Sequence, residues 1–437
     1  MLFIFKCVFL SFNRQFAKYL LLLCKKICLG VIMAKKIMKV AYKMPPQKNW
    51  NSFRDANQKN PNYITKEHYK RVVDAGFTHG MGLLEHGADV AKRALKTAKK
   101  VGLKYYVRDA VNWANILHPD YFYYNGKNYK KYMKYSSFAG VYIFDEPNTV
   151  LYLNLSKMVK GYNEFFKGVG EPLVNLLPTY ASHVEQLGAG SYEEYIEEYI
   201  KQVPTTYVMY DHYPIRVKNK TEEFLNTDFL YNCKVVAEAC KTHGRQLRTF
   251  IQSSVMDAGK TDFLPEMLDF QIHTHLAHGS QALIYYYYWA DECDNAISGI
   301  TDWHGNPTPL YYGAKKIHGE LALYEDKYLD CKWIGSRYVK GAEKHHNDVD
   351  FARVGVDESG EFKAQYDLVV GEFDYNGKKA LYLVNYTYPR LGLENEVEFD
   401  LAEDCECYHN GEMIILKKGK NMLKLKCCGG AFIIPTK

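Results

Sequence analysis

Residues 140–148 read Gly-Val-Tyr-Ile-Phe-Asp-Glu-Pro-Asn, an apolar run that stops abruptly at two acids and a proline. β-Branched and aromatic residues in such a run predict a buried strand. Pro147 cannot continue a strand ladder, so Asp145 and Glu146 are expected at the C-terminal end of this strand. In a barrel of parallel strands, catalytic groups project from that end, and a partly shielded acid there can hold a proton near neutral pH. The alternative interpretation is a strand end with two solvated acids.

Seven further apolar segments predict strands, and most of them end in charged or polar residues or in proline: 38–42, 76–81, 104–109, 173–178, 207–214, 249–254 and 282–289. Segments with helical spacing lie between them, at 66–75, 87–101, 151–166, 192–202, 221–242 and 265–278. This alternation predicts parallel strands joined by crossover helices, and eight units predict a closed (β/α)8 TIM barrel. An open doubly wound sheet is the alternative, but no Gly-x-Gly-x-x-Gly motif follows any strand.

The pattern of predicted elements changes from residue 348 onward. Short strands without intervening helices are predicted at 367–373, 380–386, 397–400, 413–416, 421–425 and 431–434, with turn signals such as Asn410-Gly411 between them. This pattern predicts a small antiparallel β-sandwich. We therefore expect an α/β chain with a barrel over residues 34–335 and a C-terminal sandwich over 348–437.

Residues 1–33 are expected to lie outside the folded unit, as a leader or as the product of a mis-set start codon ahead of Met33. Their apolar runs are interrupted by Lys25 and Lys26 and are too short for a membrane span. Residues 1–32 carry five basic residues and no acid, which leaves only +1 of the net charge of +6 for the remainder. A nearly neutral body gives no electrostatic case for a nucleic-acid partner.

The eleven cysteines, an odd number, do not predict a disulfide framework. Free thiols fit a reducing cytoplasm, and secretion or membrane tethering is the alternative if residues 1–32 are a genuine leader. The spacing of Cys405, Cys407, Cys427 and Cys428 differs from the Cys-x-x-Cys of metal knuckles. No metal or other cofactor is therefore expected.

A barrel followed by a β-sandwich resembles the clan A-type glycoside hydrolases, in particular their β-galactosidase-like members. In that clan the fourth strand ends in Asn-Glu-Pro, and its Glu is the general acid/base. Here Phe144-Asp145-Glu146-Pro147 closes the fourth predicted strand, with Asp145 in the place of Asn. The segments 269–289 and 302–312 also resemble the final part of the barrel in those enzymes. The resemblance implies a carbohydrate substrate and Glu146 as proton donor.

One residue departs from that family pattern. The nucleophile of the clan is a Glu at the end of the seventh strand, where this chain has Gln252, and glutamine cannot form a glycosyl-enzyme ester. Asp211, at the end of the sixth strand, is the predicted second carboxylate, and Asp291, Glu292 and Asp109 are the alternatives. The other predicted substrate contacts lie at or after strand ends: Asp145, Asp109, Arg108, Tyr213, Gln252, Trp289, Asp291 and Glu292.

The sequence thus predicts a hydrolase of oligo- or polysaccharides, with Glu146 and Asp211 as its catalytic acids. The fourth and sixth strands are not neighbours, so a gap of about 6.5–9.5 Å and inversion of the anomer are expected. Two alternatives remain open: a glycan-binding barrel that lost its nucleophile at Gln252, and a metal-dependent barrel hydrolase.

Overall fold

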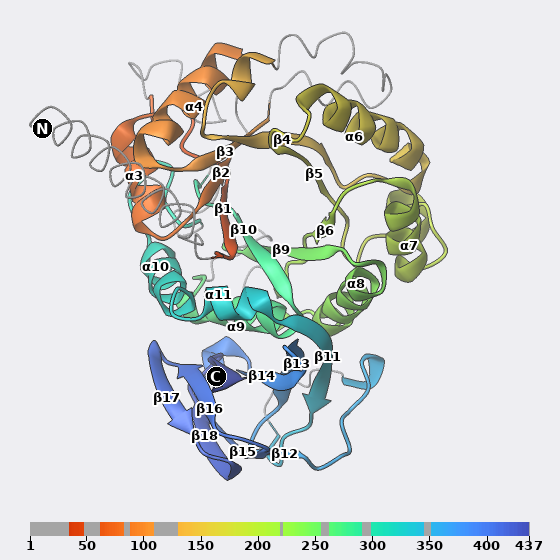
Figure 1. Cartoon of the computed structure of the whole chain (residues 1–437), viewed down its shortest axis with the longest axis vertical. Helices are drawn as coiled ribbons and strands as arrows, with labels where there is room; N and C mark the ends of the chain where they lie inside the picture. Colours follow the sequence, from red (N-terminus) through yellow and green to blue (C-terminus); the bar gives the residue numbers. More distant parts are fainter. Residues whose placement is uncertain are drawn as a thin grey trace, which may run out of the picture. The chain divides into compact units, whose positions relative to one another are not determined.

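The computed structural model describes residues 35–47, 62–82, 88–108, 130–218, 222–254, 262–290, 299–344 and 351–436. Eight parallel strands form the first sheet, in the order β5-β4-β3-β2-β1-β10-β9-β6 (Figure 1). A parallel bridge between Leu176 and Tyr210 joins its two edges and closes the barrel. The strands are β1 (Met38–Tyr42), β2 (His79–Met81), β3 (Lys104–Val107), β4 (Phe138–Asp145), β5 (Glu171–Asn175), β6 (Tyr207–Tyr210), β9 (Gln246–Gln252) and β10 (Ser280–Tyr286). All eight predicted barrel strands are present.

Side chains of the barrel strands alternate between the barrel interior and the surrounding helices, as the two-residue period of a strand requires. On β4, Tyr142 belongs to the interior cluster, whereas Val141 and Ile143 belong to the cluster that includes the helices. The other interior residues include Val40, Met81, Tyr106, Leu173, Met209, Phe250 and Ile284. The barrel is therefore a packed core, with its functional surface left to the strand ends and loops.

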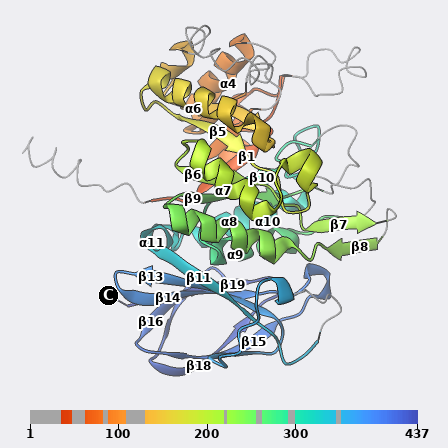
Figure 2. The ribbon, with the colours of Figure 1, turned by 90° about the vertical axis from the view of Figure 1, so that its right-hand side faces the viewer.

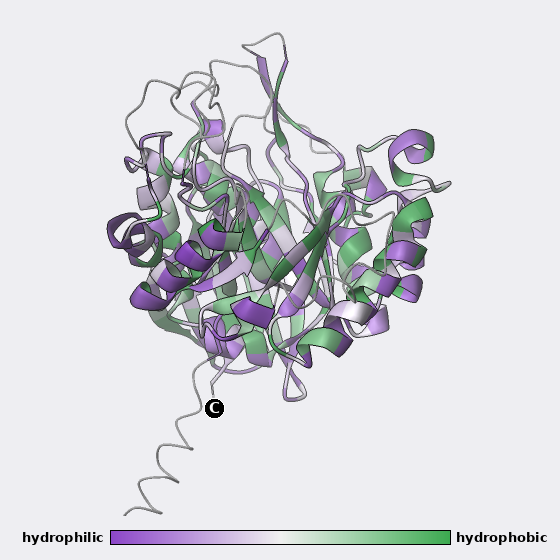
Figure 3. Cartoon of the chain, turned by 90° about the horizontal axis from the view of Figure 1, so that it is seen from above, coloured by the Kyte–Doolittle hydropathy of each residue, from purple (hydrophilic) through white to green (hydrophobic). Residues whose placement is uncertain are grey.

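Seven longer helices surround these strands (Figure 1): α3 (Lys66–Asp74), α4 (Ala88–Val101), α6 (Tyr152–Phe166), α7 (Tyr192–Gln202), α8 (Phe229–His243), α9 (Pro265–Ala277) and α10 (Pro309–Leu321). Figure 3 shows hydrophobic and hydrophilic residues mixed along the outer helices, as expected for helices with one buried side. In α9, by contrast, every residue from Met267 to Ala277 is buried. That helix is covered on all sides.

The prediction of a helix over 221–242 is wrong at its start. Residues before α8 form a two-stranded hairpin of β7 (Ile215–Lys218) and β8 (Glu222–Leu225), seen at the right of Figure 2. Helix α8 begins only at Phe229, after the N-cap Asp228. Ile215 and Val217 alternate with Arg216 and Lys218, a two-residue period that favours a strand over a helix.

Two antiparallel sheets form the C-terminal region. The six-stranded sheet has the order β11-β13-β14-β19-β16-β17, and the three-stranded sheet has the order β12-β15-β18. Their bounds are β11 (Lys332–Val339), β12 (Phe362–Ala364), β13 (Leu368–Tyr375), β14 (Lys378–Asn385), β15 (Asn395–Leu401), β16 (Cys405–His409), β17 (Glu412–Leu416), β18 (Gly419–Leu425) and β19 (Gly430–Pro435). A shared core that includes Val370, Leu383, Val397, Phe399 and Leu425 fills the space between the sheets. This is a β-sandwich, as predicted.

The sandwich contains strands that the sequence did not reveal: β11, β12 and β16. Strand β11 spans residue 335, the predicted end of the barrel, and pairs with β13 of the sandwich. The predicted domain limits stay predictions. Residues 37–437 form one compact unit.

Polar contacts join the six-stranded sheet to helix α9 and to His278, the residue that caps its C-terminus. His273 Nδ1 lies 2.8 Å from the Tyr382 hydroxyl, and His278 Nε2 lies 3.0 Å from the Tyr338 hydroxyl. Both histidines are buried, and burial lowers the pKa of His273 to about 3 and that of His278 to about 4. These neutral imidazoles act as packing and hydrogen-bonding groups.

Candidate functional site

Glu146 follows the last residue of β4. Its φ of 51° lies in the left-handed region, which is uncommon for residues other than glycine and marks local backbone strain. The Glu146 N–H donates to the carbonyl of Asn175, at the end of β5, over 2.9 Å. The neighbouring strand therefore holds this unusual turn in place, and the Glu146 side chain remains accessible to solvent.

Asp211 follows the last residue of β6 and is only 3% exposed. Asn175 lies between the two strand ends and connects their acids through its side chain. Its Nδ2 donates to Asp211 Oδ1 over 2.9 Å and to Asp145 Oδ1 over 3.1 Å. Two acids, at the ends of β4 and β6, therefore bind one amide group of the strand between them.

The two predicted catalytic acids have raised pKa values. Desolvation, followed by the charge of Asp145, raises the pKa of Glu146 to about 7, although a hydrogen bond with Asp211 acts in the opposite direction. Burial raises the pKa of Asp211 well above its ordinary value, and the charges of Glu146 and Asp145 add to this effect. Both acids therefore retain their protons to higher pH than a solvated carboxyl group does.

The expected wide gap between these acids is absent. A hydrogen bond with Asp211 contributes to the pKa of Glu146, which places the two carboxyl groups closer together than the predicted spacing of about 6.5–9.5 Å. The physical reason lies on β5, because Asn175 contacts both residues: its carbonyl accepts from the Glu146 N–H, and its side-chain amide donates to Asp211. The order of the strands alone predicted too large a distance between the two carboxyl groups.

Aromatic side chains flank the acids. The Tyr42 ring, at the end of β1, lies 5.4 Å from that of Tyr286 at the end of β10. Tyr286 in turn lies 5.3 Å from the ring of the predicted contact Tyr213. Tyr180 is 38% exposed. Desolvation raises its pKa, and the charges of Asp211 and Glu146 add to this effect, which places Tyr180 close to both acids. Such rings offer flat apolar faces beside the carboxyl pair.

Arg108 follows β3 and contacts the same aromatic group. Its Nη1 donates to the Tyr42 hydroxyl over 3.1 Å, and its guanidinium lies 4.9 Å from the centre of the Tyr142 ring. The charges of Asp145 and Arg108 both influence the pKa of Tyr42, which burial raises well above its ordinary value. The structure therefore brings Arg108, Asp145 and Tyr213 into the neighbourhood of the acid pair.

Two other predicted contacts are buried and engaged elsewhere. Gln252 is fully buried, and its side chain accepts from the Ile215 N–H over 3.0 Å and donates to the carbonyls of Ile215 and Ser254. Trp289 is 1% exposed, with its ring 4.6 Å from Tyr63 and 5.7 Å from His68. The predicted residues Asp109, Asp291 and Glu292 lie outside the described residues.

Four residues of this site were not predicted from the sequence: Asn175, Tyr180, Tyr42 and Tyr286. Tyr42, Asn175 and Tyr286 are the last residues of their strands, so the rule that singled out Asp211 would also have found them. Tyr180 lies in the loop after β5, where its only signal is an exposed aromatic side chain. That exposure is visible only in the folded chain.

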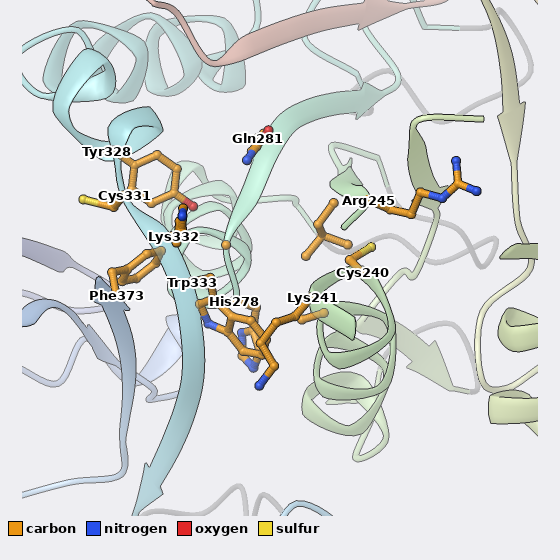
Figure 4. A pocket seen from close by; sticks show the side chains of 13 residues that line it. Cys240, Lys241, Arg245, His278, Gln281, Tyr328, Cys331, Lys332, Trp333 and Phe373 are labelled. Carbon is orange, nitrogen blue, oxygen red and sulfur yellow. The ribbon is translucent and has the colours of Figure 1, made fainter. Parts of the chain in front are cut away.

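A separate pocket of about 140 Å³ opens at the other ends of the barrel strands, near the beginnings of β9 and β10 (Figure 4). Its lining includes Lys241, His278, Lys332 and Trp333. The His278 ring and the Trp333 indole already have partners, namely the Tyr338 hydroxyl and the Ala277 carbonyl. Residues at this end of a barrel usually serve stability, so the acids at the C-terminal ends remain the candidate site.

Across the described ranges, no group of three or more His, Cys, Asp or Glu side chains is arranged to hold a metal ion. The seven cysteines in those ranges are free thiols: Cys233, Cys240, Cys331, Cys405, Cys407, Cys427 and Cys428. No helix within the described part of the chain combines the length and apolar character that crossing a bilayer requires.

Comparison with known proteins gives structural likeness only. No protein-family model matches the chain, and no curated protein matches it. The β-galactosidase from Bacillus circulans sp. alkalophilus aligns with a TM-score of 0.59 at 9% identity, over 92% of this chain and 99% of that one. An Anoxybacillus α-amylase aligns with a TM-score of 0.49 at 11% identity, over 92% and 98% of the two chains.

A putative α-L-fucosidase from Bacteroides thetaiotaomicron aligns with a TM-score of 0.41 at 13% identity, over 58% of this chain and 86% of that one. These solved structures are glycoside hydrolases. At such identities, the β-galactosidase alignment establishes the fold of this chain and not its activity.

Proposed function

We propose that this chain is a glycoside hydrolase that cleaves O-glycosidic bonds of an oligo- or polysaccharide, with Glu146 as general acid and Asp211 as its partner. The observation that carries this proposal is the cluster of Asp145, Glu146 and Asp211 at the C-terminal ends of β4 and β6, where the Asn175 side chain binds Asp145 and Asp211. Acid pairs at that end of a barrel suit glycosidic cleavage, which needs a proton donor and a negative charge near the sugar.

Glu146 is the group that reaches the substrate. It is accessible to solvent, and its pKa of about 7 lets it hold a proton at neutral pH and still release it. In the first step its proton moves to the glycosidic oxygen while the bond from that oxygen to the anomeric carbon breaks. The leaving sugar departs as an alcohol, and the remaining sugar becomes oxocarbenium-like.

Asp211 assists this proton transfer by stabilising the Glu146 carboxylate that it produces. Once Glu146 has lost its proton, protonated Asp211 donates a hydrogen bond to the new carboxylate. The pair then holds one negative charge beside the positively charged sugar, which stabilises it. Water adds to the anomeric carbon, and its proton returns to Glu146, so the acid is ready for another turnover.

The aromatic residues supply a surface on which a sugar can bind. Tyr180 and Tyr286 keep part of their rings exposed, while Tyr42 and Tyr213 are buried behind them. An aromatic ring packs well against the apolar face of a pyranose. We therefore assign Tyr180 and Tyr286 to the sugar-binding surface.

A glycan-binding barrel that lost its nucleophile at Gln252 is less well supported. The Gln252 amide donates to two backbone carbonyls and accepts from one backbone N–H in a fully buried place. A glutamate there would lose both donated bonds and bury a charge, which is costly. Gln252 thus has a structural reason to be glutamine.

The proposal is tested by incubating the full chain with a panel of glycans of different linkages and measuring the release of reducing ends. The wild type and the matched control Glu185→Gln, an exposed acid beyond β5, should release them equally. The Glu146→Gln variant should release far fewer reducing ends than either of them. Chelators should leave the rate unchanged, whereas their inhibition would favour a metal-dependent hydrolase. Glycan binding without release of reducing ends would favour a binding barrel, and equal activity of Glu146→Gln would remove Glu146 from the mechanism.

A further inference from the structure

Strand β17 forms one edge of the six-stranded sheet. It pairs on one side with β16, from Glu412 opposite His409 to Leu416 opposite Cys405. In the part of the chain that the structure describes, no strand pairs with its other side. An edge of this kind presents a row of backbone N–H and C=O groups to which another strand can bind.

The side chains on this edge are unusually apolar. Met413, Ile414 and Ile415 are consecutive, and their exposed fractions are 51%, 41% and 45%. Natural sheets usually protect an edge with lysine, proline or a bulge, and the five residues of β17 contain none of these. The strand therefore lacks the features that keep an edge from pairing.

The exposed side chains lie on both faces of the sheet. Ile414 is opposite Cys407, which belongs to the core between the two sheets. Met413 is opposite Tyr408, which belongs to the cluster on the other face. A strand added to this edge would thus bury apolar surface on both faces while it completes the backbone hydrogen bonds.

The ends of β17 carry opposite charges. Glu412 begins the strand and Lys418 follows its end, and the described residues offer neither of them an ion-pair partner. Lys417, by contrast, already pairs with Asp404 over 2.9 Å. If two copies of the strand lie antiparallel, the acidic end of each approaches the basic end of the other. The strand is therefore complementary to itself in both charge and apolar character.

We propose that β17 pairs in antiparallel fashion with β17 of a second copy of this chain, so that the protein is a dimer joined through its C-terminal sheets. A two-fold axis passes through the middle of the paired strands, and one continuous sheet of twelve strands results from two six-stranded ones. This inference is independent of the proposed glycosidase activity.

The experiment measures the mass of the full chain by sedimentation velocity over a range of protein concentrations. The wild type should sediment as a dimer. Ile414→Lys places a charge at the centre of the pairing edge and should give a monomer with unchanged circular dichroism. The matched control Met422→Lys changes a residue on β18 that is 71% exposed, and it should remain a dimer. A wild type that stays monomeric at every concentration would overturn the proposal, as would a dimer that survives Ile414→Lys.

Charge reversal provides a second test in case Ile414→Lys does not fold. Glu412→Lys and Lys418→Glu should each weaken the dimer, because like charges then face each other across the two-fold axis. The double variant restores opposite charges and should recover the dimer. Equal dissociation constants for all four proteins would show that these ends do not meet.

Discussion

The two ends of the barrel place a carboxyl group in opposite electrostatic environments. At the N-terminal end, Glu171 of β5 receives two hydrogen bonds from the Arg248 guanidinium, over 2.8 and 3.0 Å, and a third from the Tyr106 hydroxyl over 2.6 Å. At the C-terminal end, the carboxyl of Glu146 meets that of Asp211, and Asp145 lies beside them.

This contrast separates a structural charge from a functional one. The charge of Glu171 is neutralised by a guanidinium that also stacks on the Tyr207 ring, with its carbon 3.9 Å from the ring centre. Burial instead raises the pKa values of Glu146 and Asp211, and the negative charges of neighbouring acids add to this, so both carboxyl groups retain protons to higher pH. A paired carboxylate stabilises the barrel, whereas a carboxyl pair stores a proton that can be transferred.

The largest expected effect follows from removal of the transferable proton. Glu146→Gln keeps the shape of the side chain but cannot donate a proton, so kcat should fall by about a hundred- to ten-thousandfold. The loss should be smaller on substrates with good leaving groups, which need little protonation. Steady-state kinetics on the two substrate types checks this, and an equal loss on both would contradict the role of general acid.

The next effect concerns the N-terminal end. Arg248→Met leaves Glu171 without its cation and should lower the free energy of unfolding by about 3 kcal/mol, the low end for a buried pair because Glu171 is 28% exposed. Activity per folded molecule should stay unchanged. Lys70→Met, which removes a surface partner of Asp74, is the matched control and should cost less than about 1 kcal/mol. A strong loss of activity in folded Arg248→Met would show that the N-terminal end of the barrel also contributes to activity.

A smaller effect should appear in the pH dependence of stability. The folded chain holds protons on Asp211 and Glu146 that the unfolded chain releases above about pH 4. Their contribution to stability is therefore complete below that pH and is lost as pH rises through the raised pKa values, which for Glu146 is about 7. Because asparagine cannot ionise, the Asp211→Asn variant should lose less stability than the wild type as pH rises.

Melting temperatures measured from pH 4 to pH 8 check this expectation. The Asp211→Asn variant should melt above the wild type at pH 8, and the difference should narrow toward pH 4. A variant that is less stable than the wild type at every pH would show that Asp211 is an ordinary buried structural acid.

The smallest effect concerns Asn175, which joins the acids of β4 and β6. Its hydrogen bond lowers the pKa of Asp211, so Asn175→Ala should move the basic limb of the pH–rate profile upward, by less than about one unit. The control Asn163→Ala changes an exposed residue of α6 and should leave the profile in place. A loss of stability with an unmoved profile would assign Asn175 a purely structural role.

The sequence was sufficient to predict the barrel because most of its strands contain apolar residues in sequence, and Pro147 and Pro214 follow the ends of two of them. The β7–β8 hairpin was missed because its short strands lie directly before a true helix. Strand β11 was missed because most of its residues are partly or fully exposed, and β12 because it has only three residues. Strand β16 was missed because Glu406 and His409 interrupt its short apolar pattern.

The site was predictable only in part for a related reason. Glu146 and Asp211 stand at the ends of recognisable strands, so their place could be inferred from the chain alone. Their proximity could not, because it depends on Asn175 of the intervening strand, whose carbonyl accepts from the Glu146 N–H and whose side chain binds Asp211. Trp289 was predicted to contact substrate because it lies at the end of a predicted strand, but Tyr63 and His68, from distant segments, pack against its ring.

The central claim, that the C-terminal end of the barrel holds a proton on a carboxyl pair, is tested most directly by titration of Glu146 itself. Carboxyl ¹³C NMR of the full chain, with the Glu146 signal assigned by its loss in Glu146→Gln, gives its apparent pKa. The account predicts a midpoint at about 7. A midpoint near 4.3, the ordinary value for glutamate, would contradict it.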